Sequence, residues 1–227
     1  MIRVLLADDQ ALMRAGFRAL LDAEDDIEVV AEAADGARAV TLAVQHLPDV
    51  ALLDVQMPVM NGIEATRRIV ADPRLSDLKV VMLTNYGLDT YVFDALRAGA
   101  SGFLLKDTEP ADLLQAIHIV SRGDALLAPS VTRALISELV SRPTTDNPTA
   151  GLDVLTPREQ EIVALVARGL SNDQIAQHMV ISPLTAKTHV SRAMVKLHAR
   201  DRAQLVVWAY ESGLVAPRGT GESRRPD

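Results

Sequence analysis

The sequence DVQMPVMNG, residues 54–62, decides the fold class of this chain. It follows an apolar run at residues 50–53, and a short apolar run of this kind predicts a buried strand. The carboxylate of Asp54 is therefore expected where that strand ends and a loop begins. In an open α/β sheet, ligands bind at this edge. Asp54 is thus a candidate functional residue.

Equivalent polar side chains end three further apolar runs. An isolated aspartate after a strand is usually a cap or a turn residue, and an isolated lysine usually lies over apolar surface. The joint placement of such residues at four strand ends instead favours a single functional site. They are Asp8 and Asp9 after residues 2–7, Thr84 after residues 80–83, and Lys106 after residues 103–105.

The first half of the chain alternates five times between an apolar run and a segment with helical spacing. Parallel strands need crossover connections, so this alternation predicts an α/β fold with a doubly wound parallel sheet. The strands are apolar throughout, as strands covered on both faces are. Strands are expected at residues 2–7, 27–31, 50–53, 79–83 and 102–105, and helices at 10–22, 37–46, 62–70, 89–98 and 111–121.

A second, smaller all-α domain is expected at residues 152–217. Two capping boxes and two prolines at first helical positions mark its helix starts. Two short helices, a three-residue turn and a longer polar helix predict a helix-turn-helix. We expect the first domain at residues 1–122, a linker with a helix near 129–141 at residues 123–151, and a disordered tail at 218–227. The helices of the second domain are expected at about 156–169, 171–179, 182–197 and 201–212.

Charge and composition narrow the function classes. Of the 227 residues, none is cysteine, which excludes disulfides and thiolate metal sites. The net charge of −7 is uneven: residues 1–125 carry 11 Lys/Arg and 20 Asp/Glu, whereas residues 152–217 carry 7 and 6. This asymmetry suggests two domains with different partners. No apolar stretch approaches the roughly 20 residues of a membrane span, and the chain starts directly with a strand pattern, so we expect a cytoplasmic protein without membrane contact.

The acidic cluster has a specific chemical use. Clustered carboxylates repel one another unless a cation holds them, and Mg²⁺ (or Mn²⁺) prefers oxygen ligands. Asp9, Asp54 and the backbone carbonyl of Gln56 would provide them, with Asp8 reaching the ion through water. Asp54 then becomes a plausible nucleophile toward an incoming phosphoryl group. The oxygens of that group would contact the metal, the Lys106 ammonium and the Thr84 hydroxyl.

Residues 1–122 resemble the receiver domain of bacterial two-component response regulators. The resemblance implies Mg²⁺-dependent transfer of a phosphoryl group from a sensor histidine kinase to Asp54. It also implies a shift of a switch hydroxyl and a switch aromatic that changes the surface around the fourth helix and fifth strand. The residues that carry it are Asp8, Asp9, Asp54, Met57, Pro58, Gly62, Thr84, Phe103 and Lys106.

The longer helix of the second domain has one polar and one apolar face. A charged helix face is usually just solvated, and the net charge of +1 of this domain is a weak signal for DNA. Donors on such a face can nevertheless meet base edges and phosphates. The outward side chains are expected to be Thr185, Lys187, Thr188, Ser191, Arg192 and Lys196, and the inward ones Ala186, His189, Val190 and Met194.

Residues 152–215 are similar to the LuxR-type domain of the NarL/FixJ response regulators. The similarity lies in LTPRE at 155–159, GLSN at 169–172, Ile175-Ala176, KTHV at 187–190 and Lys196-Leu197. It implies binding to double-stranded DNA. It also implies that Lys187, Thr188 and Ser191 read bases and that Thr185 and Arg192 contact phosphates.

These patterns predict a DNA-binding transcriptional regulator controlled by phosphorylation, not an enzyme beyond self-phosphorylation and slow dephosphorylation at Asp54. Phosphorylation is expected to favour a homodimer; without it the receiver would shield the recognition helix or keep the chain monomeric. Two alternatives remain. One is a phospho-aspartyl phosphatase, which usually carries a second acid where this chain has Gln56. The other is a signalling relay whose helical domain binds protein.

Overall fold

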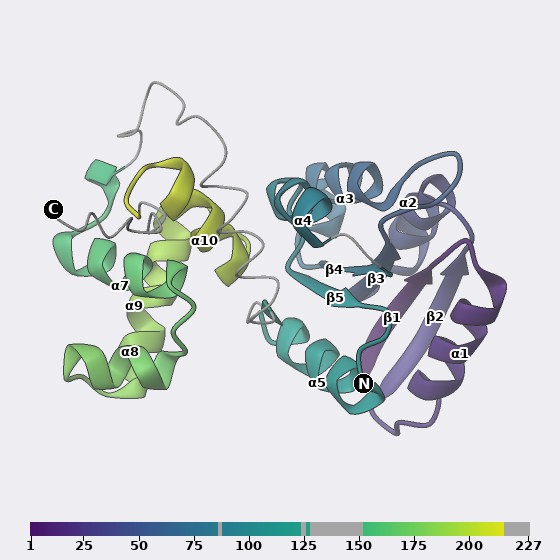
Figure 1. Cartoon of the computed structure of the whole chain (residues 1–227), viewed down its shortest axis with the longest axis horizontal. Helices are drawn as coiled ribbons and strands as arrows, with labels where there is room; N and C mark the ends of the chain where they lie inside the picture. Colours follow the sequence, from purple (N-terminus) through teal and green to yellow (C-terminus); the bar gives the residue numbers. More distant parts are fainter. Residues whose placement is uncertain (86–87, 124–125, 128–151, 216–227) are drawn as a thin grey trace, which may run out of the picture.

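The computed structural model describes residues 1–85, 88–123, 126–127 and 152–215 (Figure 1). Within them, an N-terminal α/β domain is followed by a C-terminal domain of helices. The helix expected near residues 129–141, most of the expected linker and the tail at 218–227 lie outside the described residues. None of the described helices is both long and apolar enough to cross a membrane.

The N-terminal domain is built on a parallel sheet with the strand order β2-β1-β3-β4-β5-β6. The five expected strands are confirmed. The sixth, β6, adds two residues at the edge beside β5 and is too short to show any periodicity in the sequence. The strands are β1 Ile2–Ala7, β2 Ile27–Ala33, β3 Val50–Asp54, β4 Lys79–Thr84, β5 Gly102–Leu105 and β6 Leu126–Leu127.

Helices cover both faces of this sheet, as Figure 1 shows. Alternate residues of each strand point to opposite faces. Leu5 packs in a core under α2, α3 and α4, whereas Leu6 packs in a second core under α1 and α5. A short 3₁₀ turn, Pro73–Leu75, follows α3 where the sequence indicated only a break. The helices are α1 Ala11–Leu21, α2 Gly36–His46, α3 Gly62–Ala71, α4 Leu88–Arg97 and α5 Pro110–Ser121.

The C-terminal domain has the four expected helices. Both capping boxes form: Thr156 with Glu159 at the start of α7, and Ser171 with Gln174 at the start of α8. The side chain of Ser182 caps α9 by accepting a hydrogen bond from the backbone N–H of Thr185. A 3₁₀ turn, Leu152–Val154, precedes α7 Pro157–Ala167, α8 Asn172–Met179, α9 Pro183–Lys196 and α10 Arg202–Glu211.

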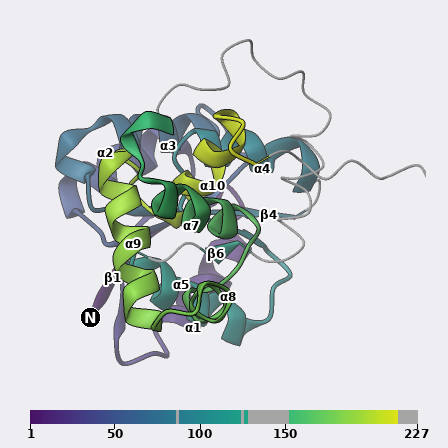
Figure 2. The same ribbon diagram turned by 90° about the vertical axis from the view of Figure 1, so that its left-hand side faces the viewer.

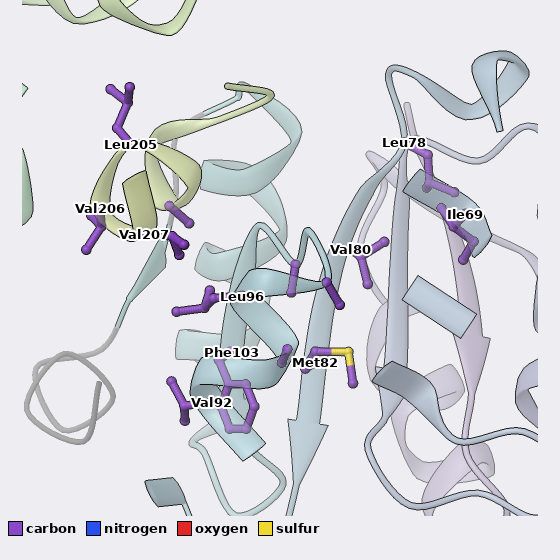
Figure 3. Packing of buried hydrophobic residues seen from close by; sticks show 14 of the residues in the cluster. Ile69, Leu78, Val80, Met82, Val92, Leu96, Phe103, Leu205, Val206 and Val207 are labelled. Carbon is purple, nitrogen blue, oxygen red and sulfur yellow. The ribbon is translucent and has the colours of Figure 1, made fainter. Parts of the chain in front are cut away.

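The two domains share an interface between α4 and α10. In Figure 2 the C-terminal helices lie in front of the sheet, and α10 lies between α7 and α4. Val206 and Val207 of α10 belong to the same apolar cluster as Val92 and Leu96 of α4 (Figure 3). Apolar burial at this junction favours the packed arrangement of the domains.

Candidate functional site

Strand register brings the candidate residues to one edge of the sheet. In parallel strands, the residues that follow a matched pair emerge at the same edge. Here the matched pairs at the carboxyl ends of β1, β3, β4 and β5 are Ala7 with Leu53, Asp54 with Leu83, and Thr84 with Leu105. Asp8, Asp54, Thr84 and Lys106 therefore meet there, as expected from the strand ends.

Three carboxylates and one ammonium form the centre of this edge. Carboxylate oxygens of Asp8, Asp9 and Asp54 lie within 4.8 Å of one another. The Nζ atom of Lys106 lies 2.7 Å from Oδ2 of Asp8 and 3.0 Å from Oδ2 of Asp54. Asp8, Asp54 and Lys106 are buried, whereas Asp9 is exposed. With all four ionised, the charges sum to about −2, the excess that one divalent cation neutralises.

The donor set of this cluster suits a hard cation. Among the described residues, neither Oδ2 of Asp8 nor Nζ of Lys106 has a partner of regular hydrogen-bond geometry, although the two form an ion pair. The Lys106 ammonium offsets only one of the three carboxylate charges, so these oxygens can still bind a cation. Asp8, Asp9 and Asp54 supply oxygen donors only, which are the ligands that Mg²⁺ prefers.

Burial and neighbouring charges raise the pKa values of both central groups, for different reasons. Burial raises the pKa of Asp54, and the nearby charge of Asp8 adds to this, while Lys106 opposes it. Burial lowers the pKa of Lys106, but its close ion pairs with the carboxylates of Asp8 and Asp54 outweigh this, so the pKa of Lys106 is raised. Lys106 therefore stays a cation at neutral pH, ready to face developing negative charge.

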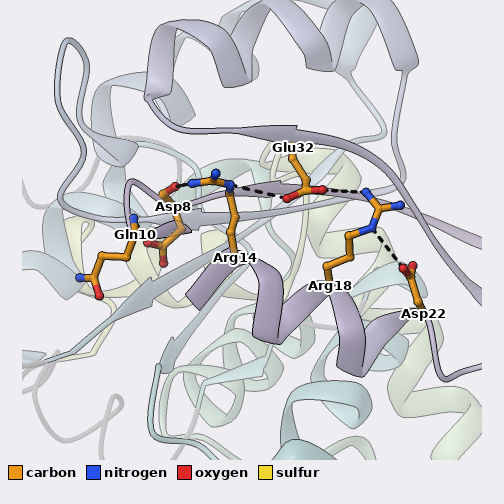
Figure 4. A network of polar contacts seen from close by, with 6 residues as sticks. All are labelled: Asp8, Gln10, Arg14, Arg18, Asp22 and Glu32. Atoms are coloured by element: carbon orange, nitrogen blue, oxygen red, sulfur yellow. Dashed lines mark hydrogen bonds and ion pairs between the residues drawn. The ribbon is translucent and has the colours of Figure 1, made fainter. Parts of the chain in front are cut away.

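A polar network on α1 holds the turn that carries the acidic pair (Figure 4). Nη1 of Arg14 donates a 2.7 Å hydrogen bond to the backbone carbonyl of Asp8, and the N–H of Gln10 donates to Oδ1 of Asp8 at 2.8 Å. Glu32 of β2 pairs with Arg14 at 3.6 Å and with Arg18 at 2.7 Å. This network, which no strand or helix period reveals, fixes the position of Asp8.

Gly62 allows the loop after β3 to close tightly. A Cβ atom at this position would lie 2.1 Å from the backbone oxygen of Asp54. The N–H of Gly62 donates a 3.0 Å hydrogen bond to the carbonyl of Val55, and Asn61 caps α3. Glycine is therefore required here, because any side chain would push α3 away from the acidic cluster.

Gln56 links this loop to α4. Its side-chain amide donates a 3.2 Å hydrogen bond to the hydroxyl of Tyr91, and both residues line a pocket that also contains Asp9. The sequence singled out the backbone carbonyl of Gln56 as a metal ligand but gave no sign of Tyr91. The tyrosine places α4 in direct contact with the loop of the acidic site.

Thr84 and Phe103 are buried on the neighbouring strands β4 and β5. Thr84 is buried at the end of β4, and its backbone carbonyl accepts from the N–H of Lys106 at 2.8 Å. Phe103 is fully buried on β5, beside Val92 and Leu96 of α4 (Figure 3). Buried side chains thus connect the strands of the acidic site to α4, so a change at the site can alter the packing of α4.

The second candidate site is the outward face of α9. Its six expected side chains are all exposed, while Ala186 and Val190 are buried and His189 and Met194 are partly buried. Three of the six are also tied within the domain. Thr188 donates to the carbonyl of Leu184 at 2.8 Å, the hydroxyls of Thr185 and Ser182 lie 2.8 Å apart, and Lys196 pairs with Glu159 at 2.7 Å.

Two family models match the chain. The response regulator receiver domain model matches residues 4–118, and the model of the bacterial regulatory proteins of the luxR family matches residues 153–209. The chain is a response regulator of the LuxR-type family. The phosphorylation-controlled, DNA-binding class of transcriptional regulator that the sequence predicted is thereby confirmed.

Relatives match this chain over almost its whole length. The response regulator is 43% identical to the uncharacterized transcriptional regulatory protein YxjL of Bacillus subtilis, covering 94% of this chain and 97% of that protein. It is 41% identical to the transcriptional regulatory protein LiaR of the same organism, over 95% and 100%. The crystal structure of the response regulator ChrA, from a heme-sensing two-component system, is 37% identical with a TM-score of 0.51, over 94% and 98%.

In the response regulator, the carboxylate of Asp201 accepts hydrogen bonds from both domains. Oδ1 of Asp201 caps α10 by accepting from the N–H of Gln204, and Oδ2 accepts a 2.6 Å hydrogen bond from the hydroxyl of Ser101. Nζ of Lys79 donates to the carbonyl of Arg200 at 3.1 Å. Burial raises the pKa of Asp201, and the hydrogen bond from Ser101 acts against this rise. Sequence patterns did not single out this junction.

The remaining contacts of the junction are made by long side chains. The Arg200 guanidinium donates to the carbonyls of Leu75 and Ser76 at 2.9 Å and of Leu78 at 3.2 Å. The side chain of Gln204 donates to the carbonyl of Leu96 at 2.8 Å. The receiver thus covers α10 and leaves the outward face of α9 exposed, so the expected shielding of the recognition helix is not found in this structure.

Proposed function

We propose that Asp54 accepts a phosphoryl group from a sensor histidine kinase and thereby controls the response regulator's binding to DNA. The observation that supports this most strongly is the buried pair of Asp54 and Lys106 beside two further carboxylates. Mg²⁺ or Mn²⁺ would be held by Asp9, Asp54 and the backbone carbonyl of Gln56, with Asp8 reaching it through water. Bound there, the ion would neutralise the excess negative charge of the cluster.

The chain's own residues would carry the transfer. An oxygen of Asp54 attacks phosphorus, a P–O bond forms, and the P–N bond of the kinase phosphohistidine breaks. Lys106 would turn from its carboxylate partners to a phosphoryl oxygen, since its ammonium already lies 3.0 Å from Asp54. Thr84, at the end of the neighbouring strand, would donate its hydroxyl to another.

The output would pass through α4. Phe103 packs against α4, Tyr91 links α4 to the loop after β3, and α10 lies on the other side of α4. A shift of Thr84 and Phe103 would therefore disturb the surface on which α10 rests. We propose that this frees the C-terminal domain to form a homodimer on DNA. The receiver would then control DNA binding through its contact with α10, and not by shielding α9.

The exposed face of α9 supports the DNA contacts. Lys187, Thr188 and Ser191 would face base edges, and Thr185, Arg192 and Lys196 would lie nearer phosphates. A solved structure of two RcsB dimers bound to two parallel DNAs shares the fold at 24% identity and a TM-score of 0.55. One domain of net charge about +1 makes few phosphate contacts, so pairing should matter for affinity.

Intact-mass analysis tests the phosphoryl-acceptor role. We expect incubation with acetyl phosphate and Mg²⁺ to add one phosphoryl group to the chain, and the adduct to be absent in Asp54→Asn and after chelation of the metal. Asp25→Asn, at an exposed position away from the site, is the matched control and should be modified normally. Modification of Asp54→Asn to the wild-type extent would refute the assignment.

DNA binding by the same samples tests the second half of the proposal. We expect the modified chain to bind duplex DNA more tightly than the unmodified one, with an affinity that falls steeply with salt because counterions are released. A relay domain that binds protein would give no such salt dependence. Equal affinity of both forms would show that phosphorylation does not control DNA binding.

A further inference from the structure

The recognition helix begins with a large apolar side chain in water. Leu184 is the second residue of α9, and its side chain is 74% exposed. It belongs to neither of the two apolar cores among the described residues. Its burial therefore does not stabilise the fold, and a leucine in the first turn of a helix brings no favourable interaction with the helix dipole.

Leu184 lies on the same groove as the residues proposed to read bases. Lys187, Thr188 and Ser191 follow it at spacings of three, four and seven residues, and all four line one groove on α9. Side chains at these spacings share one face of a helix. In a helix-turn-helix, the N-terminal part of the second helix reaches base edges in the major groove.

The hydroxyl of Thr188 changes what this face offers. It donates to the backbone carbonyl of Leu184 at 2.8 Å, so its proton is used inside the helix. The γ-methyl group of Thr188 remains as an apolar group four residues after the leucine, on the same face of α9. The two apolar groups suit contact with a methyl group on the edge of a base pair. The neighbouring cation, Lys187, suits the negatively charged DNA that carries it.

We infer that Leu184, with the methyl group of Thr188, recognises the C5-methyl group of a thymine in the major groove. Among the four bases of DNA, thymine alone carries a methyl group there, and apolar side chains are its usual contacts. This inference rests on the proposed DNA-reading role of α9 and adds a specificity residue to it.

Selection from random duplexes identifies the preferred site. The full-length chain, treated with beryllofluoride and Mg²⁺, is mixed with a random duplex library, and the bound fraction is sequenced. We expect an enriched site with an invariant thymine, and loss of the preference for that thymine alone in Leu184→Ala. The matched control is Val195→Ala, an exposed apolar residue on the same groove about 16 Å along the helix, which should keep the preference.

Replacement of that thymine by deoxyuridine removes only the methyl group. We expect this change to weaken binding of the wild-type chain and of Val195→Ala by about fourfold, the effect of one methyl group. Binding of Leu184→Ala should weaken clearly less, because only the methyl group of Thr188 then remains to contact the thymine. An equal loss in Leu184→Ala and wild type, or an unchanged thymine preference, would overturn the inference while leaving DNA binding intact. No enriched site for the wild-type chain would overturn the DNA-reading role together with it.

Discussion

The hydroxyl of Ser101 donates a 2.6 Å hydrogen bond to Oδ2 of Asp201, and the two residues belong to different domains. Ser101 directly precedes β5, the strand that carries Phe103 and leads to Lys106. Asp201 directly precedes α10 and caps it. The start of α10 is therefore tied to the strand that leads to Lys106 of the acidic site.

Removal of this hydroxyl should loosen the junction. We expect Ser101→Ala to lower the free energy of separating α10 from the receiver by about 1.5–3 kcal/mol, because a hydrogen bond to a buried carboxylate is lost. Hydrogen exchange of the α10 amides and the emission of Trp208, the only tryptophan, measure this. Ser121→Ala at the end of α5 is the control. Unchanged exchange in α10 would show that the bond does not hold the domains together.

The charge of Asp54 should cost stability until a cation binds. Its pKa is raised by burial, so the folded state disfavours the ionised form, and the cost is present above that pKa and vanishes as the pH falls below it. We expect Asp54→Asn to raise the melting temperature of the receiver by about 3–6 °C at pH 7 without metal, for a gain of roughly 1 kcal/mol.

The effect of Mg²⁺ on the melting temperature distinguishes charge repulsion at Asp54 from an unrelated effect of the Asp54→Asn substitution on stability. Mg²⁺ should stabilise the wild-type chain and the control Asp25→Asn, and should have little effect on Asp54→Asn. Thermal scans with and without the ion at pH 7 and pH 4 provide the measurement. A lower melting temperature for Asp54→Asn at pH 7 would contradict the expected charge repulsion.

Glu159 should stabilise the C-terminal domain in a defined pH range. Its pKa is lowered to about 2, first by the hydrogen bond with Lys196, so the stabilisation is present above the ordinary pKa of about 4.5 and is lost as the pH falls toward 2. We expect Glu159→Gln to unfold at a lower urea concentration than wild type at pH 6, with the difference narrowing between pH 4.5 and 2. Glutamine keeps the capping geometry, so a constant difference across this range would argue against the ion pair.

Val180 should be replaceable with a gain in stability. It ends α8 with φ of 54°, a left-handed conformation that a β-branched residue adopts at a cost, and its side chain is 90% exposed. We expect Val180→Gly to raise the free energy of unfolding of this domain by about 1 kcal/mol. The same substitution at the exposed helical position Val195 should lower it. Urea unfolding followed by Trp208 emission compares the two, and a loss in both would contradict the strain.

The acidic site could be predicted from the sequence because parallel strands end at a common edge. Asp8, Asp54 and Lys106 each follow an apolar run in the sequence. Once these runs are taken as parallel strands, their common end places the three residues together. The hydrogen bond between Gln56 and Tyr91 could not be predicted, since periodicity does not say which loop residue meets which helix. The same holds for the second carboxylate oxygen of Asp201, whose partner depends on how the domains pack.

The recognition helix shows a similar division. Helical spacing predicted the exposed and buried faces of α9, and the exposure of Lys187 and burial of Ala186 agree with it. Spacing gives no information on rotamers, so the inward hydrogen bond of Thr188 and the ion pair of Lys196 were missed. Leu184 was overlooked because an exposed leucine reads as unremarkable until the polar residues of the same groove surround it.

The junction between the domains bears on which receivers and DNA-binding domains can be exchanged. Arg200 binds three backbone carbonyls, which any receiver of this shape presents whatever its side chains. Asp201 instead needs a donor at position 101. In a chimera, the arginine contact would survive a change of receiver, whereas the aspartate would be left buried without its donor unless the new receiver carries a hydroxyl there. Among the polar contacts of Arg200 and Asp201, the one to Asp201 is therefore the one that depends on a particular receiver side chain.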